Sequence, residues 1–191
     1  MTQQHGAGAV VVGSGHMVDA PDRPTPRFPP SQVGRVSRAV AETLQAWEIG
    51  PDSTIVTGGA RGTDIIVAES GLALSARLLL CLALPPEEFA SQSVALPDTD
   101  WTARFQRLLE RAEVRVLADE ARSVSDDVFA RANVFMLQTA RALTDHDLRA
   151  IVVWNGEDGD GPGGTADFIQ RARNEGVTDD RLRVIDPAVV S

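Results

Sequence analysis

The sequence predicts an α/β fold: a doubly wound, mainly parallel sheet with helices on both faces. Short apolar segments alternate with helical patterns along almost the whole chain. These segments are continuously hydrophobic, as expected for strands that are covered on both sides. With 191 residues, the chain is long enough for one good core and too short for two full domains. We therefore expect residues 1–191 to form a single domain.

The elements follow in regular order from the first apolar run, AVVVG. Each expected strand is a compact run of aliphatic residues, and these runs lie at Ala9–Gly13, Thr54–Gly58, Arg77–Leu84, Val114–Leu117, Ala150–Trp154 and Leu182–Asp186. Each is followed by polar or glycine-rich residues, and helical patterns lie near Gln32–Trp47, Thr63–Ser75, Pro86–Ser93, Asp100–Ala112, Asp126–Leu143 and Thr165–Asn174. Strand followed by helix, repeated, is typical of a Rossmann-like sheet.

The overall charge bears on which binding partners we expect. Eighteen basic and 27 acidic residues give a net charge of −9. Sequence-independent binding to nucleic acid needs clustered Lys and Arg to neutralise phosphates. We therefore expect no nucleic-acid partner.

The cysteine content and the hydropathy pattern indicate the cellular compartment in which we expect the protein. Cys81 is the one cysteine, so no disulfide can form within the chain, and its apolar surroundings predict a small buried side chain. The N-terminus has no basic segment before its short apolar run. The longest apolar stretch, Leu72–Leu84, is interrupted by Ser75 and Arg77 and is too short to cross a bilayer. We expect a cytoplasmic protein with no membrane partner.

Two connections are longer than the fold needs. The Pro-rich segment His16–Pro30 follows the first strand, and Asn155–Gly164 follows the fifth. Loops beyond about twelve residues are uncommon without a role. The carboxylates of the second loop lack the spacing of a calcium loop, so we predict a solvated acidic segment and no metal site.

Three glycine-marked turns are expected at one edge of the sheet: Gly13–His16, Thr57–Asp64 and Asp160–Asp167. Loops that follow parallel strands all emerge at the carboxyl edge, where such sheets bind ligands. Glycine turns can point free backbone N–H groups at an anion, although they also serve as ordinary tight turns. No GxxxxGK[ST] or GxGxxG fingerprint occurs, which disfavours phosphoryl transfer and a dehydrogenase.

The candidate ligand-binding residues come from these turns: Gly13, Ser14, Gly15, His16, Gly58, Gly59, Arg61, Gly62, Asp64, Gly163, Gly164 and Thr165. The guanidinium of Arg61 suits a phosphate, or it is a solvated loop residue. Asp64 either caps the following helix or accepts ribose hydroxyls. His16 is either a general acid or a loop cap.

The stretches VVGSGH, IVTGGARGTDIIVAE and VVWNGEDGDGPGGTAD together resemble the SLOG superfamily, a Rossmann-like group that includes LOG phosphoribohydrolases and DprA-type domains. The segments DWTARFQRLLERA and DDVFARANVFML are similar to the SLOG-like module of bacterial signalling proteins with tetratricopeptide-repeat or cyclase modules. The likeness spans about Val10 to Arg173. It implies a nucleotide-derived ligand in a sensing setting.

The same likeness bears on catalysis. Pro162-Gly163-Gly164-Thr165 looks like a contracted form of the PGGxGTxxE motif of LOG enzymes. The nearest following acid, Asp167, comes one residue earlier than that pattern places its glutamate. Arg131 lies in a helix comparable to the one that carries an arginine in those enzymes. Arg131 and Asn133 are two residues apart, so they should face different sides of that helix.

Three functions stay open. We favour a nucleotide-binding sensor module without a cofactor. The second is an N-glycosidic hydrolase of a nucleoside monophosphate or NAD-like substrate, in which Asp64, Glu69 or Asp167 supplies the catalytic carboxylate. The third is a protein-interaction module without a ligand. We expect a homodimer that acts with a separately encoded effector.

Overall fold

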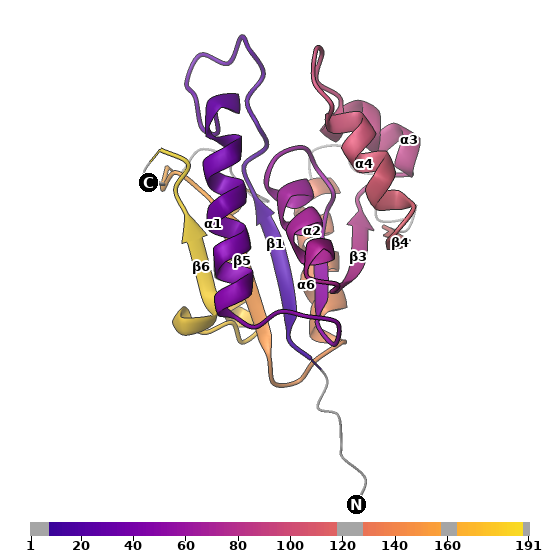
Figure 1. The fold of residues 1–191 in the computed structure, drawn as a ribbon, viewed down its shortest axis with the longest axis vertical. Coiled ribbons are helices and arrows are strands. Elements are labelled where there is room, and N and C mark those ends of the chain that lie inside the picture. The colour runs from indigo at the N-terminus through magenta and orange to yellow at the C-terminus, as the bar shows by residue number, and fades with distance from the viewer. Residues whose placement is uncertain (1–7, 118–127, 158–163, 189–191) are drawn as a thin grey trace, which may run out of the picture.

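The computed structural model describes residues 8–117, 128–157 and 164–188. Six strands form one all-parallel sheet, in the order β4-β3-β2-β1-β5-β6 (Figure 1). Their bounds are β1 Val10–Gly15, β2 Thr54–Thr57, β3 Arg77–Leu82, β4 Glu113–Val116, β5 Leu148–Val153 and β6 Leu182–Ile185. The predicted α/β class, with a parallel sheet between helices, is confirmed.

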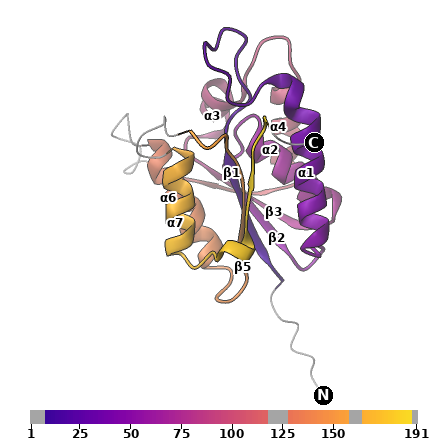
Figure 2. The same ribbon diagram turned by 90° about the vertical axis from the view of Figure 1, so that its left-hand side faces the viewer.

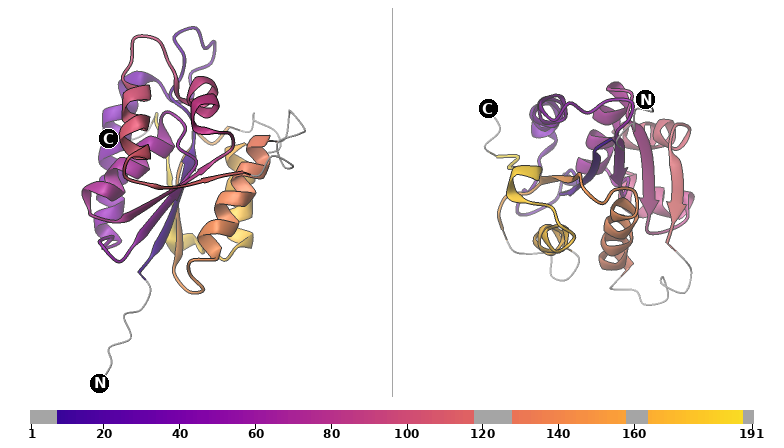
Figure 3. Two further views of the ribbon diagram at one scale, coloured as in Figure 1. Left: turned by 90° about the vertical axis from the view of Figure 1, so that its right-hand side faces the viewer. Right: turned by 90° about the horizontal axis from the view of Figure 1, so that it is seen from below.

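Helices cover both faces of the sheet. Their bounds are α1 Val33–Ala46, α2 Thr63–Ala73, α3 Pro86–Phe89, α4 Trp101–Leu109, α6 Val128–Arg141 and α7 Thr165–Asn174. Figures 2 and 3 show α1, α2 and α4 on one face and α6 and α7 on the other. Short 3-10 turns, η1 at Pro30–Gln32 and η3 at Asp179–Arg181, precede α1 and β6.

The core consists of two apolar layers divided by the sheet. Side chains alternate along each strand, so Val11 and Ile55 pack under α1 and α2. Val10, Val12 and Val56 point to the opposite face, under α6 and α7. Burial on both faces explains why β1 is apolar at three consecutive positions, Val10 to Val12.

Several element boundaries differ from the sequence prediction by two or three residues, and two of the differences affect the cavity. β1 continues to Gly15 instead of ending at Gly13, because it pairs with β5 as far as Val153. The single helix expected over Pro86–Ser93 divides into α3 and a π-helical segment η2, Ala90–Val94. This segment carries side chains to the carboxyl edge of the sheet.

The direction of chain winding reverses once. From β1 the chain adds β2, β3 and β4 on one side and then returns to place β5 and β6 on the other side of β1. The reversal leaves a crevice above the carboxyl ends of β1 and β5. The long loop after β1 lies at this edge (Figure 1), and so does the start of α7, which is labelled in Figure 2.

Candidate functional site

A cavity of about 630 Å³ opens at the carboxyl edge of the sheet. Its walls come from the loops after β1, β2 and β3 and from the first turns of α6 and α7. Parallel α/β sheets bind ligands at this edge, beside the reversal of strand order. The cavity is therefore the candidate functional site.

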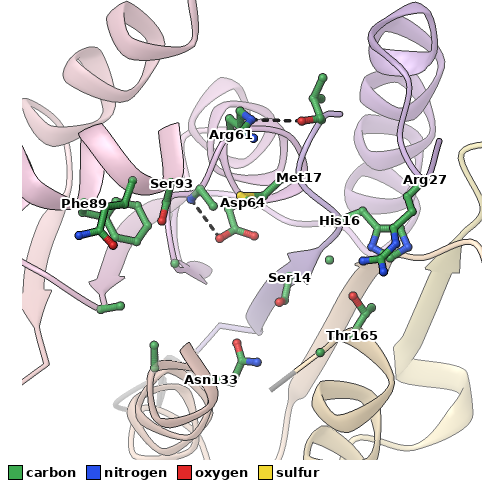
Figure 4. Close-up of a pocket in the computed structure, with 18 of the residues that line it drawn as sticks. Ser14, His16, Met17, Arg27, Arg61, Asp64, Phe89, Ser93, Asn133 and Thr165 are labelled. Atoms are coloured by element: carbon green, nitrogen blue, oxygen red, sulfur yellow. Dashed lines mark hydrogen bonds between the residues drawn. The ribbon is translucent and has the colours of Figure 1, made fainter. Parts of the chain in front are cut away.

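The lining side chains are spread along the cavity in strand order (Figure 4). Phe89 and Ser93 follow β3, and Asp64 follows β2. His16 follows β1, and Thr165 follows β5. Because the sheet runs β3-β2-β1-β5, the cavity has an aromatic end, a carboxyl group in the middle, and a polar end at the reversal point.

The first glycine turn is shaped by contacts within the protein. At Gly15, φ is +145° and a Cβ would lie 2.4 Å from the carbonyl oxygen of Val153. At Gly13, a Cβ would lie 2.7 Å from Cγ1 of Val67 on α2. Gly15 also lines the cavity, whereas Gly13 serves packing.

His16 is fixed beside β5 at the polar end of the cavity. Its backbone N–H donates to the carbonyl of Val153 over 2.9 Å, and its Nε2 lies 2.9 Å from Oδ1 of Asn155. The side chain is buried, and both His16 and Ser14 line the cavity. The ring therefore faces the position where a ligand would lie.

The second glycine turn, Thr57–Asp64, is also constrained by packing. Gly59 has φ of +83°, and a Cβ there would lie 3.1 Å from the ring of Phe105. Gly62 has φ of +95°, and a Cβ there would lie 2.6 Å from the backbone nitrogen of Val18. Glycine is therefore required at both of these predicted ligand-binding positions, because a side chain there would clash with neighbouring protein atoms. Gly58, Arg61 and Asp64 do line the cavity.

The first loop and the second turn are tied together. Thr63 donates its hydroxyl to the carbonyl of His16 over 2.8 Å, and Nε of Arg61 donates to the carbonyl of Val18 over 3.1 Å. Together with the close approach at Gly62, these bonds join two segments that are more than forty residues apart. The cavity wall is thus built from loops that brace each other.

Asp19 organises the mouth of the cavity. Its Oδ2 accepts the backbone N–H groups of Arg27 and Phe28, each over 2.8 Å, and its Oδ1 lies 3.3 Å from Nε of Arg23. Burial lowers the pKa of Arg61, and the charge of Asp19 partly offsets this effect. One buried carboxylate therefore holds the arginine-bearing loop against the cavity.

Asp64 presents a buried carboxyl group to the middle of the cavity (Figure 4). Its Oδ2 accepts the N–H of Ala60 over 3.1 Å, and a Cβ at Gly58 would lie only 2.9 Å from that oxygen. Burial raises the pKa of Asp64 to about 7, although hydrogen bonds from the backbone of Ala60 and Gly58 act in the opposite direction. Within the described residues, no ion pair includes Asp64. Near neutral pH this group exists in both protonation states.

The third glycine turn is described only in part. Gly163 lies outside the described residues, while Gly164 and Thr165 line the cavity at the start of α7. Gly164 is the N-cap of α7 and, as a glycine, offers no side-chain acceptor to the first N–H groups of the helix. The first N–H groups of a helix without such a cap can bind an anion.

Two of the three candidate catalytic carboxylates do not line the cavity. Glu69 on α2 forms an ion pair with Arg104 on α4, with N–O distances of 3.0 and 2.6 Å, and Arg104 also stacks over Trp101. Asp167 accepts a hydrogen bond from Arg171 over 2.7 Å along α7. Only Asp64 among the three lies in the cavity wall.

Helix α6 contributes an asparagine, not the predicted arginine. Asn133 lines the cavity together with Ala130, Ala132 and Met136. Arg131 is not among the lining residues, so the two polar side chains lie on different faces of α6. This arrangement follows from the spacing, because residues two apart on a helix point in different directions.

Sequence reasoning missed much of the lining. Arg23 and Arg27 lie in the long loop, whose length was the only signal in the sequence. Phe89, Gln92 and Ser93 reach the cavity through the break between α3 and η2, for which the sequence carries no clear mark.

Metal and thiol chemistry find little support at this site. In the described part of the chain, no three His, Cys, Asp or Glu side chains are grouped to hold a metal ion, and Asp158 and Asp160 lie outside it. Cys81 lines the cavity but is buried, and burial raises the pKa of its thiol to about 11, so it stays protonated.

Across residues 8–117, 128–157 and 164–188, no helix combines the length and the apolar character needed to cross a membrane.

Comparisons with known proteins bear on the fold alone. No protein-family model and no curated protein matches the chain. Among solved structures, DNA processing protein A (DprA) from Streptococcus pneumoniae matches with a TM-score of 0.41 and 12% identity. The match covers 94% of this chain and 58% of that protein. A likeness at this level carries no argument about ligand or activity, and the resemblance to the SLOG group stays a prediction.

The expected list of partners requires correction. We excluded nucleic acid because of the net charge of −9, a ground that does not hold; the solved structure that matches in fold alone is a DNA processing protein. The exclusion was wrong, because net charge sums over the whole surface and says nothing about a local site. The cavity illustrates the point: Arg23, Arg27 and Arg61 line it in a strongly acidic chain.

Proposed function

We propose that the cavity binds a nucleotide or a ribosyl-nucleotide-derived ligand, and that the protein acts as a sensor or signalling module. The observation that carries the proposal is the charge of the lining. Three arginines, Arg23, Arg27 and Arg61, face two acids, Asp19 and Asp64, in a chain whose net charge is −9. A cationic cavity in an acidic protein favours an anionic ligand.

The polar end of the cavity suits a phosphate. The N-terminus of α7, whose N-cap is a glycine, meets the cavity at Gly164 and Thr165. Arg27 and His16 line the same end, and the guanidinium fork matches phosphate oxygens. Helix N–H groups and an arginine would together bind one phosphate group.

The opposite end suits a base. Phe89 and Met136 offer an aromatic ring and a thioether, and Gln92 and Ser93 offer hydrogen-bonding groups. Small-molecule sites commonly combine apolar walls with a few polar groups in this way. A ligand lying along the strand order would therefore place its base over β3 and its phosphate over β1 and β5.

Hydrolysis of an N-glycosidic bond is the second candidate, and Asp64 is the observation that favours it. Its carboxyl lies in the middle of the cavity and titrates near pH 7. Such a group can donate or accept a proton at neutral pH. Release of adenine and ribose 5-phosphate from AMP, lost in Asp64→Asn and kept in Asp167→Asn, would support the hydrolase. Binding of AMP without turnover supports the sensor.

A thermal-shift panel tests the proposal, with AMP, ADP-ribose, NAD, cyclic nucleotides and cyclic dinucleotides as probes. A ligand at a hundred times its dissociation constant adds about 2.7 kcal/mol to the free energy of unfolding. For a chain of this size, that corresponds to a rise of roughly 5–10 °C in the unfolding temperature. Calorimetric titration of the probe that gives a shift then measures its affinity.

The matched variants are Arg27→Ala and Arg38→Ala. Arg27 lines the cavity, and Arg38 is exposed on α1 away from it. Loss of a charged hydrogen bond should weaken binding by roughly ten- to a hundredfold in Arg27→Ala, with no change in Arg38→Ala. Equal effects in both variants would contradict the site. Binding of a short single-stranded oligonucleotide with no mononucleotide binding would replace the proposal by a nucleic-acid site.

A further inference from the structure

Asp64 lies where the sugar of a bound nucleotide would lie. It follows β2, between the aromatic end of the cavity over β3 and the phosphate end over β1 and β5. Figure 4 shows its carboxyl between Ser93 on one side and His16 on the other. Any nucleotide placed along the strand order would bring its ribose to this group.

The carboxyl of Asp64 is held in place by the backbone. The N–H of Ala60 donates to Oδ2 over 3.1 Å, and a backbone hydrogen bond from Gly58 also reaches the carboxyl group. The side chain is only 8% exposed, so its position is set before any ligand arrives. A fixed carboxyl group of this kind discriminates between ligands more strongly than a mobile one.

The charged and titratable side chains that share the cavity leave Asp64 without a cationic partner. Arg61 directs its Nε to the carbonyl of Val18 and feels the charge of Asp19. No ion pair in the described residues contains Asp64. A buried carboxylate without a cation is stabilised by hydrogen-bond donors, and it repels a phosphate.

From this placement we infer that Asp64 accepts hydrogen bonds from the ribose hydroxyls, so that the site selects ribonucleotides over 2′-deoxyribonucleotides. The inference rests on the proposed function, since it assumes that a nucleotide occupies the cavity. A site built to pair a hydroxyl rejects the analogue without it, because its own polar group is then left unpaired. Asp64 is thus the specificity-determining residue for the sugar.

The experiment compares AMP, GMP, CMP and UMP with their 2′-deoxy counterparts by calorimetric titration. The wild-type protein should bind the ribonucleotide roughly ten- to a hundredfold more tightly than its 2′-deoxy partner. Asp64→Asn keeps the shape of the side chain but removes its charge. In this variant the ratio of the two affinities should fall toward one, mainly because the ribonucleotide binds more weakly.

The control is Asp52→Asn, which removes an exposed carboxylate outside the cavity and should leave the ratio unchanged. A purely structural role for Asp64 would weaken both nucleotides equally and keep the ratio, which would overturn the inference. If Asp64→Asn does not fold, the wild-type ratio still decides: a value near one overturns the inference. When nucleotides bind with a ratio near one, the proposed function stands and only the sugar selection falls. If none of the eight nucleotides binds, both fall.

Discussion

Asp64 holds its carboxyl group where ionisation is unfavourable. The side chain is buried in the first turn of α2, and burial outweighs the backbone hydrogen bonds that would favour the ionised form. The residue serves two ends at once, because the same carboxyl orders its own turn and faces the cavity. Of the two alternatives that the sequence offers for Asp64, helix capping is not observed, because the N-cap of α2 is Gly62 and the carboxyl accepts the N–H of Ala60 in the preceding turn.

This arrangement predicts a pH dependence of stability. The pKa of Asp64 is about 7 in the folded protein against an ordinary value of 3.8. Between these values the folded state binds a proton that the unfolded state has released, so the free energy of unfolding falls as pH rises from about 4 to about 7. The contribution of this one group is at most about 4 kcal/mol.

Urea denaturation at pH 5 and pH 8 measures this effect. The wild-type protein should lose more stability than Asp64→Asn over this interval, and the difference between the two belongs to Asp64. An Asp167→Asn variant, whose carboxylate is paired with Arg171, serves as the control. The same pH dependence in wild type and Asp64→Asn would contradict the account.

Individual site residues were only partly predictable. The sequence identifies Ser14, Gly15, His16 and Arg61 as cavity residues because glycine turns mark the carboxyl edge. Glu69 is different: its partner Arg104 lies 35 positions away, and only the packing of α2 against α4 reveals the pair. Side-chain direction on a helix depends on which face is covered, and a local pattern does not contain that information.

At the scale of elements, the mutual bracing of two loops decides the shape of the cavity. The loop after β1 and the turn after β2 meet at Gly62, where a Cβ would lie 2.6 Å from the nitrogen of Val18. Bonds from Thr63 and Arg61 join the same segments. The glycines of the GGARG turn are therefore explained by the approach of protein backbone and side chains.

Gly62→Ala should accordingly destabilise the protein. Its φ of +95° is strained for alanine, and the close backbone contact adds to the strain. The expected loss is about 1–3 kcal/mol in the free energy of unfolding. Gly34→Ala is the matched control on α1: a Cβ there meets nothing within 4 Å, and alanine should stabilise the helix by about 0.5–1 kcal/mol. The free energies of unfolding are measured by urea denaturation. Equal changes in the two variants would contradict the proposed role of Gly62 in the contact between the two loops.

Asp19 should prove necessary for the order of the arginine-bearing loop. Asp19→Ala removes the acceptor for the N–H groups of Arg27 and Phe28, whereas Asp22→Ala changes an exposed carboxylate. Hydrogen exchange at the two amides should accelerate in the first variant and stay unchanged in the second. Unchanged exchange in Asp19→Ala would show that the loop is ordered by other contacts.

Most element boundaries lie within three residues of their predicted positions, and two of the differences affect the cavity. Strand pairing carried β1 two residues past its predicted end, because β5 continues alongside it. The apolar pattern of residues 86–93 fits one helix, but a π-helical segment begins at Ala90. One extra residue in a turn leaves no periodic signal, so the side chains that it redirects into the cavity were missed.

At the scale of the whole molecule, the sheet ends in two short strands that carry charge. β4 and β6 are the outermost strands, and Glu113 and Arg115 form an ion pair on β4 with N–O distance of 2.7 Å. Charged side chains on outer strands discourage pairing with another chain. These charged side chains therefore oppose aggregation through the outer strands, and they do not line the cavity.

The double variant Glu113→Val, Arg115→Val should therefore aggregate on storage or mild heating, as measured by light scattering. The control replaces Arg38 and Glu42 on the exposed surface of α1, so that the net charge changes equally. The control should remain monodisperse to a greater extent than the β4 variant. Equal scattering would show that the loss of charge, and not its place on an outer strand, is responsible.

The class of fold was predictable, but the strand order and the local charge were not. Continuous apolar strands between helical patterns predict a parallel sheet. The inner strands β1, β2, β3 and β5 are all rich in aliphatic residues, so nothing in the sequence marks the reversal between β1 and β5. A net charge of −9 likewise averages over the surface and conceals the arginines that the folded chain gathers at one cavity.

The Pro-rich loop has a consequence for measurement. Its base is fastened through Asp19 and Phe28, while residues 21–26 between these points are exposed. A fluorescent label on a cysteine placed at Thr25 would stand at the rim of the cavity without touching its wall, and Cys81 is too deeply buried to compete for the dye. The fold thus supplies an attachment point for an optical reporter, with which a ligand could be sought in cell extracts before its chemistry is known.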